Sequence, residues 1–449
     1  MKKNALIMFL LVFLSTPLGV SADEPRYTIF NHGILFFPEA IHCDPAFTSM
    51  AKKRIPDLNG HIKRQLQKSV SSKWKLHEAN WDKTFLENVI NMAVVISRAD
   101  VSEEKMTISK KLGDVSFNTF NVGASLIFFK ISEQADSNGI QIYYNRFITG
   151  AKVVKLSSAM DHRQKEKYFQ EDLQETIDSL LKKTFEEYNP EMLQGKITKV
   201  SKDTYNIDLG FEHGLRINNV ITAELPSGSG LELSISDIQA KSCRAEALFA
   251  GPEETAGLKA GTRVTSYINA KRISNSVEAF RVNAFKVKDE ASRFAGYEDN
   301  LRQIFHDYIV ATKKINVIPS ALALNDSTLA TMKTYLNIPG SLTVVEPACD
   351  YNINAVLQKT SETTHGQSDI NRQVSYASYA AAGIRPTSGP NTDLLVTVQE
   401  AEAVTKEIIA GQSEPDQVFF MDAVQKTIRS LADQLSKEIP KKIKLSYAD

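Results

Sequence analysis

The chain has 449 residues, of which 42% are hydrophobic and 24% charged, and its 53 basic residues balance its 53 acidic residues. This composition is typical of a globular protein of about three domains, at roughly 100–200 residues each. The lack of net charge argues against a nucleic-acid binder, which needs a basic face to displace counterions from phosphates.

The N-terminal segment has the order of a secretory signal. Lys2 and Lys3 precede the apolar run Ala5–Leu14, and small residues close the segment at Ala22. This pattern predicts a cleavable signal peptide over residues 1–22. The alternative is a transmembrane anchor, but the uninterrupted apolar run is too short to cross about 30 Å of hydrocarbon. We therefore expect export to the periplasm, without lipidation because no cysteine sits near the cleavage point.

Residues 23–190 are predicted to form an α/β layer domain. Apolar residues recur every fourth position from Leu58 to Val70, which indicates a helix that starts near Asp57. Asn138-Gly139 lies between two alternating runs and indicates a hairpin. Helices packed on one sheet are expected from this order of elements. The other expected elements are strands at Gly33–Phe37, Trp74–Leu76 and Met92–Ser97, hairpin strands at Ala124–Ser132 and Ile140–Ala151, and a closing helix at about Arg163–Tyr188.

Residues 191–270 are predicted to form a small antiparallel β-barrel. Gly210 and Gly214 bracket a tight corner after the alternating run Tyr205–Leu209, where glycine tolerates positive φ. The phrase that opens at Gly214 returns in similar form at Gly257. Short alternating strands punctuated by glycine are typical of such a barrel.

Residues 275–440 are predicted to repeat the element order of the first domain. The expected fold class is therefore α+β, with two similar α/β layer domains of mixed sheets on either side of the barrel. Thr360–Asp393 is rich in Ser, Thr, Gly and Asn around a strand-like core at Val374–Ala382, and we interpret it as a mobile, exposed arm. The expected elements are strands at Phe280–Val287, Lys314–Pro319 and Ile353–Lys359, a hairpin of Leu394–Glu400 with Ala403–Ala410, helices at Tyr297–Ala311 and Asp416–Leu435, and an inserted helix at Ser327–Ile338.

Motifs for catalysis were not found. The sequence has no G-x-S-x-G nucleophile turn, no Walker loop and no dinucleotide fingerprint, and Ser227–Gly230 lies in an expected hairpin loop. His77-Glu78 has no second histidine one helical turn away, as a zinc peptidase would require.

The remaining titratable residues are interpreted as structural. The carboxylate pairs Asp161 with Glu166 and Glu171 with Asp172 are predicted on a solvated helix face, because no apolar pocket is implied around them. Asp208 is expected to form a turn. Single histidines that we interpret as surface or hydrogen-bonded residues are His32, His42, His213, His306 and His365.

The three cysteines, Cys43, Cys243 and Cys349, are too far apart in sequence to suggest a zinc site. In an oxidising compartment they allow one disulfide and one free thiol, or else three buried thiols. The sequence thus predicts no catalytic, cofactor-binding or metal-binding residue, no cofactor, and a protein that is not an enzyme.

The element order of the two outer domains resembles the small α/β domain shared by the TolB amino-terminal domain, the curli secretion protein CsgG and the lipoprotein LpoB. The stretches that carry this resemblance are GILFFPEA, KWKLHEA and SLIFFKISEQADSNGIQIYYNRFITG, followed later by AFRVNAFKVKDE, KINVIPS and LLVTVQEAEAVTKEIIAG. The β-module GKITKVSKDTYNIDLGFEHGLRINNVITAEL resembles the carboxy-terminal module of FlgT, a periplasmic protein of the flagellar outer ring. It departs from that family at Asn218-Asn219, where Gly-Asp is expected, and in lying mid-chain.

The resemblance implies a non-enzymatic periplasmic scaffold of an outer-membrane-associated assembly, either a flagellar outer ring or a secretion apparatus. The implied partners are other envelope proteins, and no nucleic acid is expected among them. A homo-oligomer and a peripheral contact with the outer membrane are both compatible with this role. Two alternatives stay open. One is a regulator of peptidoglycan synthesis that docks on a wall synthase, and the other is a hydrolase whose site is assembled from residues distant in sequence.

Overall fold

We describe the chain from a computed structural model. The predicted signal peptide, and His42 and Glu78, lie outside the described residues. None of the helices in the described part combines the length and hydrophobicity that a membrane span needs. The structure describes residues 27–41, 43–69, 74–77, 90–109, 113–133, 137–156, 160–188, 190–217, 219–247, 250–269, 278–318, 326–336, 338, 341–345, 349–367, 371–388, 393–409 and 416–445.

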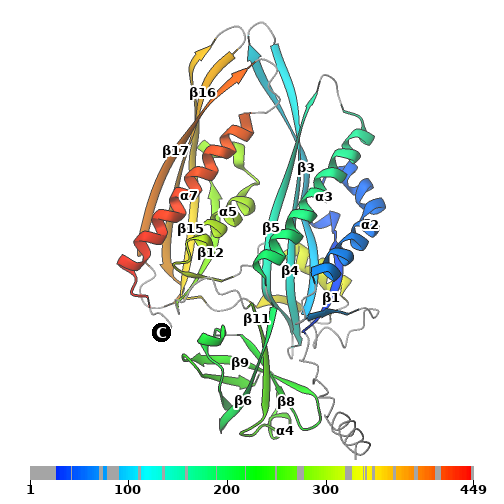
Figure 1. Cartoon of the computed structure of the whole chain (residues 1–449), viewed down its shortest axis with the longest axis vertical. Helices are drawn as coiled ribbons and strands as arrows, with labels where there is room; N and C mark the ends of the chain where they lie inside the picture. Colours follow the sequence, from blue (N-terminus) through cyan, green and yellow to red (C-terminus); the bar gives the residue numbers. More distant parts are fainter. Residues whose placement is uncertain are drawn as a thin grey trace, which may run out of the picture.

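The first α/β unit is a six-stranded mixed sheet in the order β14-β5-β4-β3-β1-β2. Helices α2 and α3 cover one face, where Phe47, Phe120 and Phe169 pack edge to face (Figure 1). Its strands are β1 (Tyr27–Leu35), β2 (Trp74–Leu76), β3 (Ile90–Ser109), β4 (Gly113–Glu133), β5 (Ser137–Leu156) and β14 (Ser341–Val345), and its helices are η1 (Pro38–Ala40), α2 (Pro45–Ser69) and α3 (His162–Glu187).

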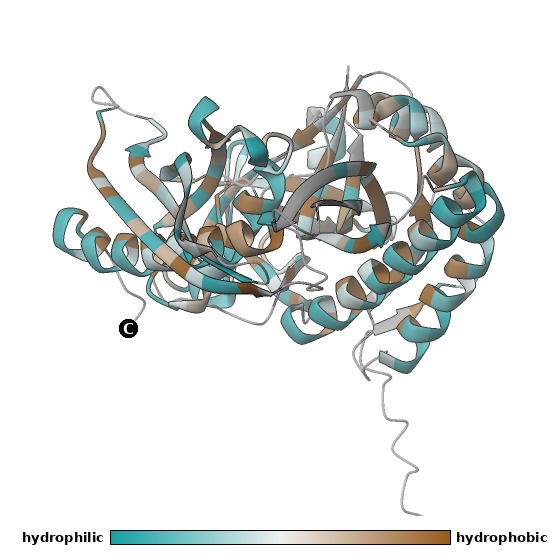
Figure 2. Ribbon diagram, turned by 90° about the horizontal axis from the view of Figure 1, so that it is seen from above, coloured by the Kyte–Doolittle hydropathy of each residue, from teal (hydrophilic) through white to brown (hydrophobic). Residues whose placement is uncertain are grey.

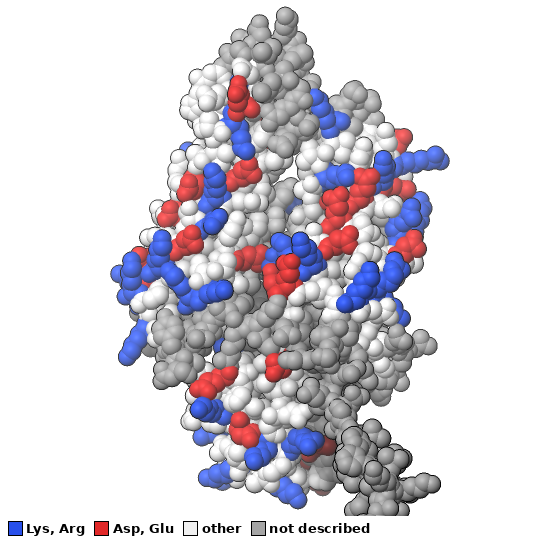
Figure 3. All heavy atoms as spheres, viewed as in Figure 1, with Lys and Arg blue, Asp and Glu red and all other residues white. Residues whose placement is uncertain are grey.

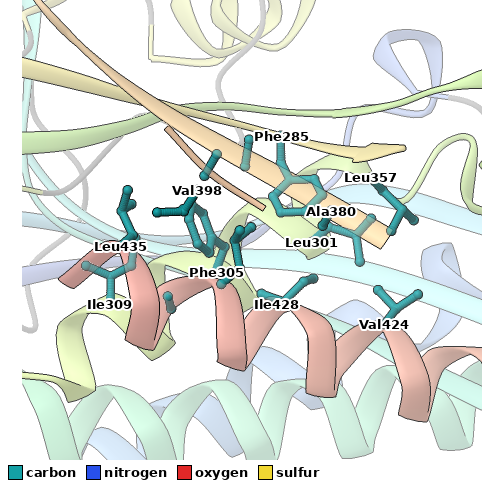
Figure 4. Packing of buried hydrophobic residues seen from close by; sticks show 14 of the residues in the cluster. Phe285, Leu301, Phe305, Ile309, Leu357, Ala380, Val398, Val424, Ile428 and Leu435 are labelled. Carbon is teal, nitrogen blue, oxygen red and sulfur yellow. The ribbon is translucent and has the colours of Figure 1, made fainter. Parts of the chain in front are cut away.

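The second α/β unit is a five-stranded sheet in the order β13-β12-β15-β16-β17. Helices α5 and α7 bury their apolar stripes on one face, and Figure 4 shows Phe305 of α5 and Ile428 of α7 turned toward the strands. Figure 2 shows hydrophilic residues on the outward sides of the helices. The elements are β12 (Ala279–Val287), η4 (Asp289–Phe294), α5 (Glu298–Ala311), β13 (Asn316–Val317), β15 (Tyr351–Gln367), β16 (Asn371–Pro386), β17 (Val396–Ile409) and α7 (Asp416–Lys442).

The two units have the same wiring. β1 lies parallel to β2 and β3, and β3, β4 and β5 follow as antiparallel neighbours. In the second unit β12 lies parallel to β13 and β15, and β15, β16 and β17 are antiparallel. The register irregularities also correspond, because one interrupts β1 against β3 and another interrupts β12 against β15. The repetition of element order is therefore a repetition of topology.

The middle of the chain is a closed barrel in the order β10-β7-β6-β11-β8-β9, and it lies below the two α/β units (Figure 1). Gly214 has φ of +94°, which explains glycine at the predicted corner. Together with the mixed sheets, the barrel confirms the predicted fold class. Its elements are β6 (Pro190–Ser201), β7 (Thr204–Ile207), η3 (Phe211–His213), β8 (Val220–Glu224), β9 (Gly230–Ile238), β10 (Cys243–Ala247), α4 (Pro252–Thr255) and β11 (Arg263–Asn269).

The start predicted for the first helix is wrong. We placed it near Asp57, but α2 begins at Pro45, with Pro56 inside the helix. Asp44 accepts a hydrogen bond from the Ala46 amide, as a capping residue does. An internal proline costs about 3 kcal/mol through its missing N–H. The first turns bury Phe47 against the sheet and α3, and this packing offsets the cost.

The expected arm at Thr360–Asp393 and the hairpin after it are also wrong. Most of that stretch is strand, in the extensions of β15 and β16, and β17 runs unbroken from Val396 to Ile409. The hairpin partner of β17 is β16, with which it pairs along its whole length. On β16 the residues Val374, Tyr376 and Ser378 are buried at alternate positions, while the small residues Ser375 and Ala377 between them are half-buried. Small residues on both faces give this strand a loop-like composition.

The inserted segment between β13 and β15 serves the first unit instead of the second. Its helix, α6 (Asp326–Tyr335), packs on the face of the first sheet opposite α2 and α3, with Met332 and Leu336 buried against Val95 and Phe129. The following strand, β14, pairs in parallel with β5. The second unit therefore supplies the cover and the outermost strand of the first.

Candidate interaction surface

The carboxylates of the two predicted pairs do not come together as acid and base. Asp161 caps α3 by accepting from the Gln164 amide at 2.8 Å. Glu166 instead accepts from Ser49 and from Lys53 of α2, and these hydrogen bonds lower its pKa. Glu171 pairs with Lys152 at the surface. Three of the four carboxylates are thus helix-face or capping groups, as predicted.

Asp172 contradicts the prediction of a solvated position. It is 1% exposed on the inner side of α3, above Gly150 of β5. Burial raises its pKa to about 7, although a backbone hydrogen bond from Val122 acts in the opposite direction. Among the described residues, neither Asp172 Oδ2 nor the Oγ1 of Thr176 has a hydrogen-bond partner. The position was missed because the helix stripe used for prediction counted only apolar residues.

The described histidines are scattered and structural. His32 is half-buried beneath α6, stacks on Phe129 with the ring centres 6.0 Å apart and shares a 3.0 Å hydrogen bond with Asn91. Burial lowers the pKa of His32 to about 4, so it is neutral. His306 lies on α5, and His365 contacts Ser375 on the exposed part of β15.

The barrel corner explains two further polar residues. The Nδ1 of His213 accepts from the Gly210 amide at 2.9 Å, and Asp208 accepts from the Lys196 amide at 2.7 Å. The His213 side chain therefore holds the backbone of the corner, whereas that of Asp208, expected to form the turn, holds the neighbouring strand β6. His77 follows the short edge strand β2, and its amide donates to the Ile29 carbonyl.

The cysteines are free thiols in this structure, with Cys243 buried in the barrel and Cys43 and Cys349 half-buried. Burial raises the pKa of Cys243 to about 12, which makes it unreactive as a nucleophile. Among the described residues, no three His, Cys, Asp or Glu side chains are grouped so that they could hold a metal ion.

An ion cluster around the buried side chain of Arg146 joins the two α/β units. Arg146 of β5 contacts Glu187 at 3.1 Å and Asp307 of α5 at 2.8 Å, and the Arg146 side chain is 6% exposed. Burial opposes ionisation of Asp307, but the hydrogen bond from His306 and the charge of Arg146 outweigh it and lower its pKa. Figure 3 shows basic and acidic side chains next to each other near the middle of the visible face.

A second set of contacts reinforces this junction. The hydroxyl of Tyr297 donates to Asn121 of β4 at 3.1 Å, and both residues are buried or nearly so. The guanidinium of Arg98 lies 4.4 Å from the centre of the Tyr297 ring. Lys130 of the first unit contacts Glu232 of the barrel at 2.6 Å. With β14, these contacts make the described parts one connected frame.

The outer face of the second sheet is an open apolar surface of this frame. In the first unit α6 covers the corresponding face, but no described helix covers it in the second. An open hollow of 480 Å³ lies there across β12, β15 and β16. It is lined mainly by apolar atoms, with Lys286 and Arg385 beside them and no carboxylate or histidine among the described lining residues.

Exposed large side chains extend this surface, which we call the outer face. Tyr379 on β16 is 41% exposed, and Leu394 and Leu395 just before β17 are 46% and 39% exposed. Leu394 lies over Gly383, where a Cβ would come within 2.6 Å of its Cδ1. The alternation of exposed and buried residues in β16 was the signal in the sequence, and it was hidden by the loop-like composition.

No protein-family model matches the chain, and no curated protein matches it either. Among solved structures it is similar to a hypothetical protein from Chlamydia trachomatis, with 11% identity over 36% of this chain and 96% of that one, and a TM-score of 0.22. A minor lipoprotein from Acinetobacter baumannii has 7% identity over 38% of this chain and 96% of its own, with a TM-score of 0.21. The rare lipoprotein B from Shewanella oneidensis has 10% identity over 36% and 94%, with a TM-score of 0.16. We infer neither the fold nor the activity of this chain from them.

Proposed function

We propose that this chain is a non-enzymatic scaffold of the bacterial periplasm that serves an outer-membrane-associated assembly, such as a secretion apparatus or a flagellar outer ring. The observation that carries the proposal is that two units with the same strand topology differ in how their sheets are covered. The first sheet has its outer face covered by α6 and its edge extended by β14, whereas the second leaves both uncovered among the described residues. An uncovered apolar patch on a folded frame favours binding to a protein partner.

The rigid junction supports the same role. A scaffold must hold its binding surface at a fixed orientation, and the Arg146 cluster and the Tyr297 contacts fix the second sheet against the first. The signal-like N-terminus supports export. The hollow on the outer face lacks the acid and base groups that hydrolysis would require among its described lining residues.

The test is envelope fractionation of cells that express the full chain at its native level. We expect it to co-purify with an outer-membrane ring or secretion complex, and we expect Tyr379→Ser combined with Leu394→Ser to release it without changing its abundance. The matched control is Tyr335→Ser, which removes a tyrosine that is 54% exposed on α6, away from the outer face. A chain found only as a free protein in every fraction would contradict the scaffold role.

A further inference from the structure

The outermost strand of the second sheet presents a long open edge in the described part of the chain. β17 has 14 residues and pairs on one side only, with β16. The other terminal strands are much shorter, with three residues in β2, two in β13 and five in β14. An unpaired edge presents N–H and C=O groups that readily accept another strand. Among the terminal strands of the described sheets, β17 alone is long enough for an extended strand pair.

The sequence of β17 is self-complementary when two copies run antiparallel about Ala403. In this register Glu400 lies opposite Lys406 of the second copy, and the twofold axis forms this pair twice. Val398 likewise lies opposite Ile408 of the second copy. Opposite charges and apolar pairs at facing positions each stabilise an antiparallel pair by roughly 0.2–1 kcal/mol.

Side-chain polarity selects among neighbouring registers. In the joined sheet, side chains on the helix-covered face of one copy must lie opposite side chains on the same face of the other. The twofold axis must therefore pass through a residue of β17, and alternative registers place it at a neighbouring residue. Centring the axis on Glu402 would place that carboxylate opposite its own copy, which is destabilising. Centring it on Val404 would pair Glu402 with Lys406 but place Glu400 opposite Ile408. The Ala403 register avoids the like-charge contact and keeps Val398 opposite Ile408, while Glu402 lies opposite Val404.

The surroundings of β17 leave room for a second strand. Its outward-facing residues are small or uncharged from Thr397 to Thr405, and Ala401 and Ala403 are exposed. On the helix side, Glu400, Glu402 and Lys406 remain partly exposed, so α7 does not seal the edge. Lys406 is held at the edge by Asp422 of α7 at 3.0 Å.

We propose that β17 pairs with β17 of a second copy of this chain, forming a continuous ten-stranded sheet with a twofold axis at Ala403. Such an isologous contact uses the same surface on both copies and closes the assembly at a dimer. The two outer faces then lie on one side of the joined sheet, and both α7 helices lie on the other. This inference does not depend on the scaffold role proposed above.

The first test measures oligomeric state by sedimentation equilibrium of the full mature chain. We expect a dimer for the unaltered protein and weakening of at least about tenfold for Ala403→Lys, which places two lysines opposite each other at an exposed position. Gln399→Lys is the matched control, because its lysine faces Glu407 of the second copy and should preserve or strengthen the dimer. Thermal unfolding should show that both variants remain folded.

The second test determines the register by cysteine crosslinking. Ala401→Cys and Thr405→Cys should crosslink when the two variants are mixed, because these positions face each other, and neither should crosslink strongly with itself. The unaltered chain, with its three native thiols, gives the background. A monomer at all concentrations, an Ala403→Lys variant that dimerises as well as Gln399→Lys, or crosslinking of each variant with itself alone would overturn the proposal.

Discussion

Replacing Asp172 with asparagine should change how the stability of the protein depends on pH. The carboxyl group is buried under α3 with one oxygen lacking a partner among the described residues, so its charged form is destabilised in the folded state. Asparagine has nearly the same shape but does not ionise. The difference in unfolding free energy between the two proteins therefore isolates the ionisation of this one group.

The size of the effect follows from the two pKa values. Burial raises the pKa of Asp172 from 3.8 to about 7 in the folded protein. The folded state binds this proton more tightly than the unfolded state does. Protonation of Asp172 therefore adds its full contribution to the free energy of unfolding below pH 3.8, and this contribution is lost as the pH rises to about 7. At about 1.36 kcal/mol per pH unit, the loss amounts to at most ~4 kcal/mol. Above that window the contribution is constant.

The assay is urea unfolding of the unaltered chain and Asp172→Asn at several pH values between about 4 and 8. We expect the stability of the variant relative to the unaltered chain to increase with pH across this window and then to level off. Glu175→Gln is the control, since Glu175 lies three residues away with a side chain that is 72% exposed. A difference that stays constant with pH, or one that Glu175→Gln reproduces, would refute the reasoning.

Three further substitutions test the packing of the frame. Arg146→Met should destabilise the chain by on the order of 3 kcal/mol, because it leaves Asp307 without the guanidinium that pairs with it. The control, Lys152→Met, removes a surface ion pair and should cost about 0–1 kcal/mol. Calorimetry measures both changes in stability, and equal effects would argue against a structural junction at Arg146. Gly150→Ala should lower the stability by about 1–3 kcal/mol, because the new Cβ would lie 2.3 Å from Asp172 Oδ1. The control is Gly366→Ala, whose Cβ would meet no atom within 4 Å. Similar denaturation midpoints for the two variants would show that Asp172 can move away from the new methyl group. Met332→Ala should lower the stability by about 2–5 kcal/mol, because it opens a cavity between α6 and the first sheet. The control, Thr334→Ala on the exposed side of α6, should cost about 0.5 kcal/mol or less. If Met332→Ala leaves the stability unchanged, α6 does not pack on the first sheet through this residue.

The sequence predicted the elements whose signal is local. The hairpin of β4 and β5, the glycine corner of the barrel and the apolar stripe of α7 each depend on neighbouring residues, and each was found near its predicted place. Asn138 and Gly139, however, lie within β5 opposite Glu133 and Ser132 and do not form the turn. The repeated element order also predicted the shared wiring of the two units, since a sheet with one covered face allows few arrangements of those elements.

Features that depend on distant contacts could not be predicted in the same way. The assignment of α6 and β14 to the first sheet is set by residues such as Phe129 and Ile140, which are far away in the chain. Burial of Asp172 depends on the absence of a side chain at Gly150 of another strand. The outer face was missed because β16 is rich in small residues such as Ser375, Ala377 and Gly383, and this composition is shared by exposed loops.

Site-specific photocrosslinking in living cells tests the scaffold role most directly. A photoreactive residue at position 379, on the outer face, is compared with one at Lys426, which is exposed on α7 on the opposite side of the sheet. The account predicts that the 379 probe forms an adduct that sediments with the outer membrane and contains a subunit of a ring or secretion complex, while the Lys426 probe does not. The absence of any such adduct from position 379, or equal adducts from both positions, would contradict it.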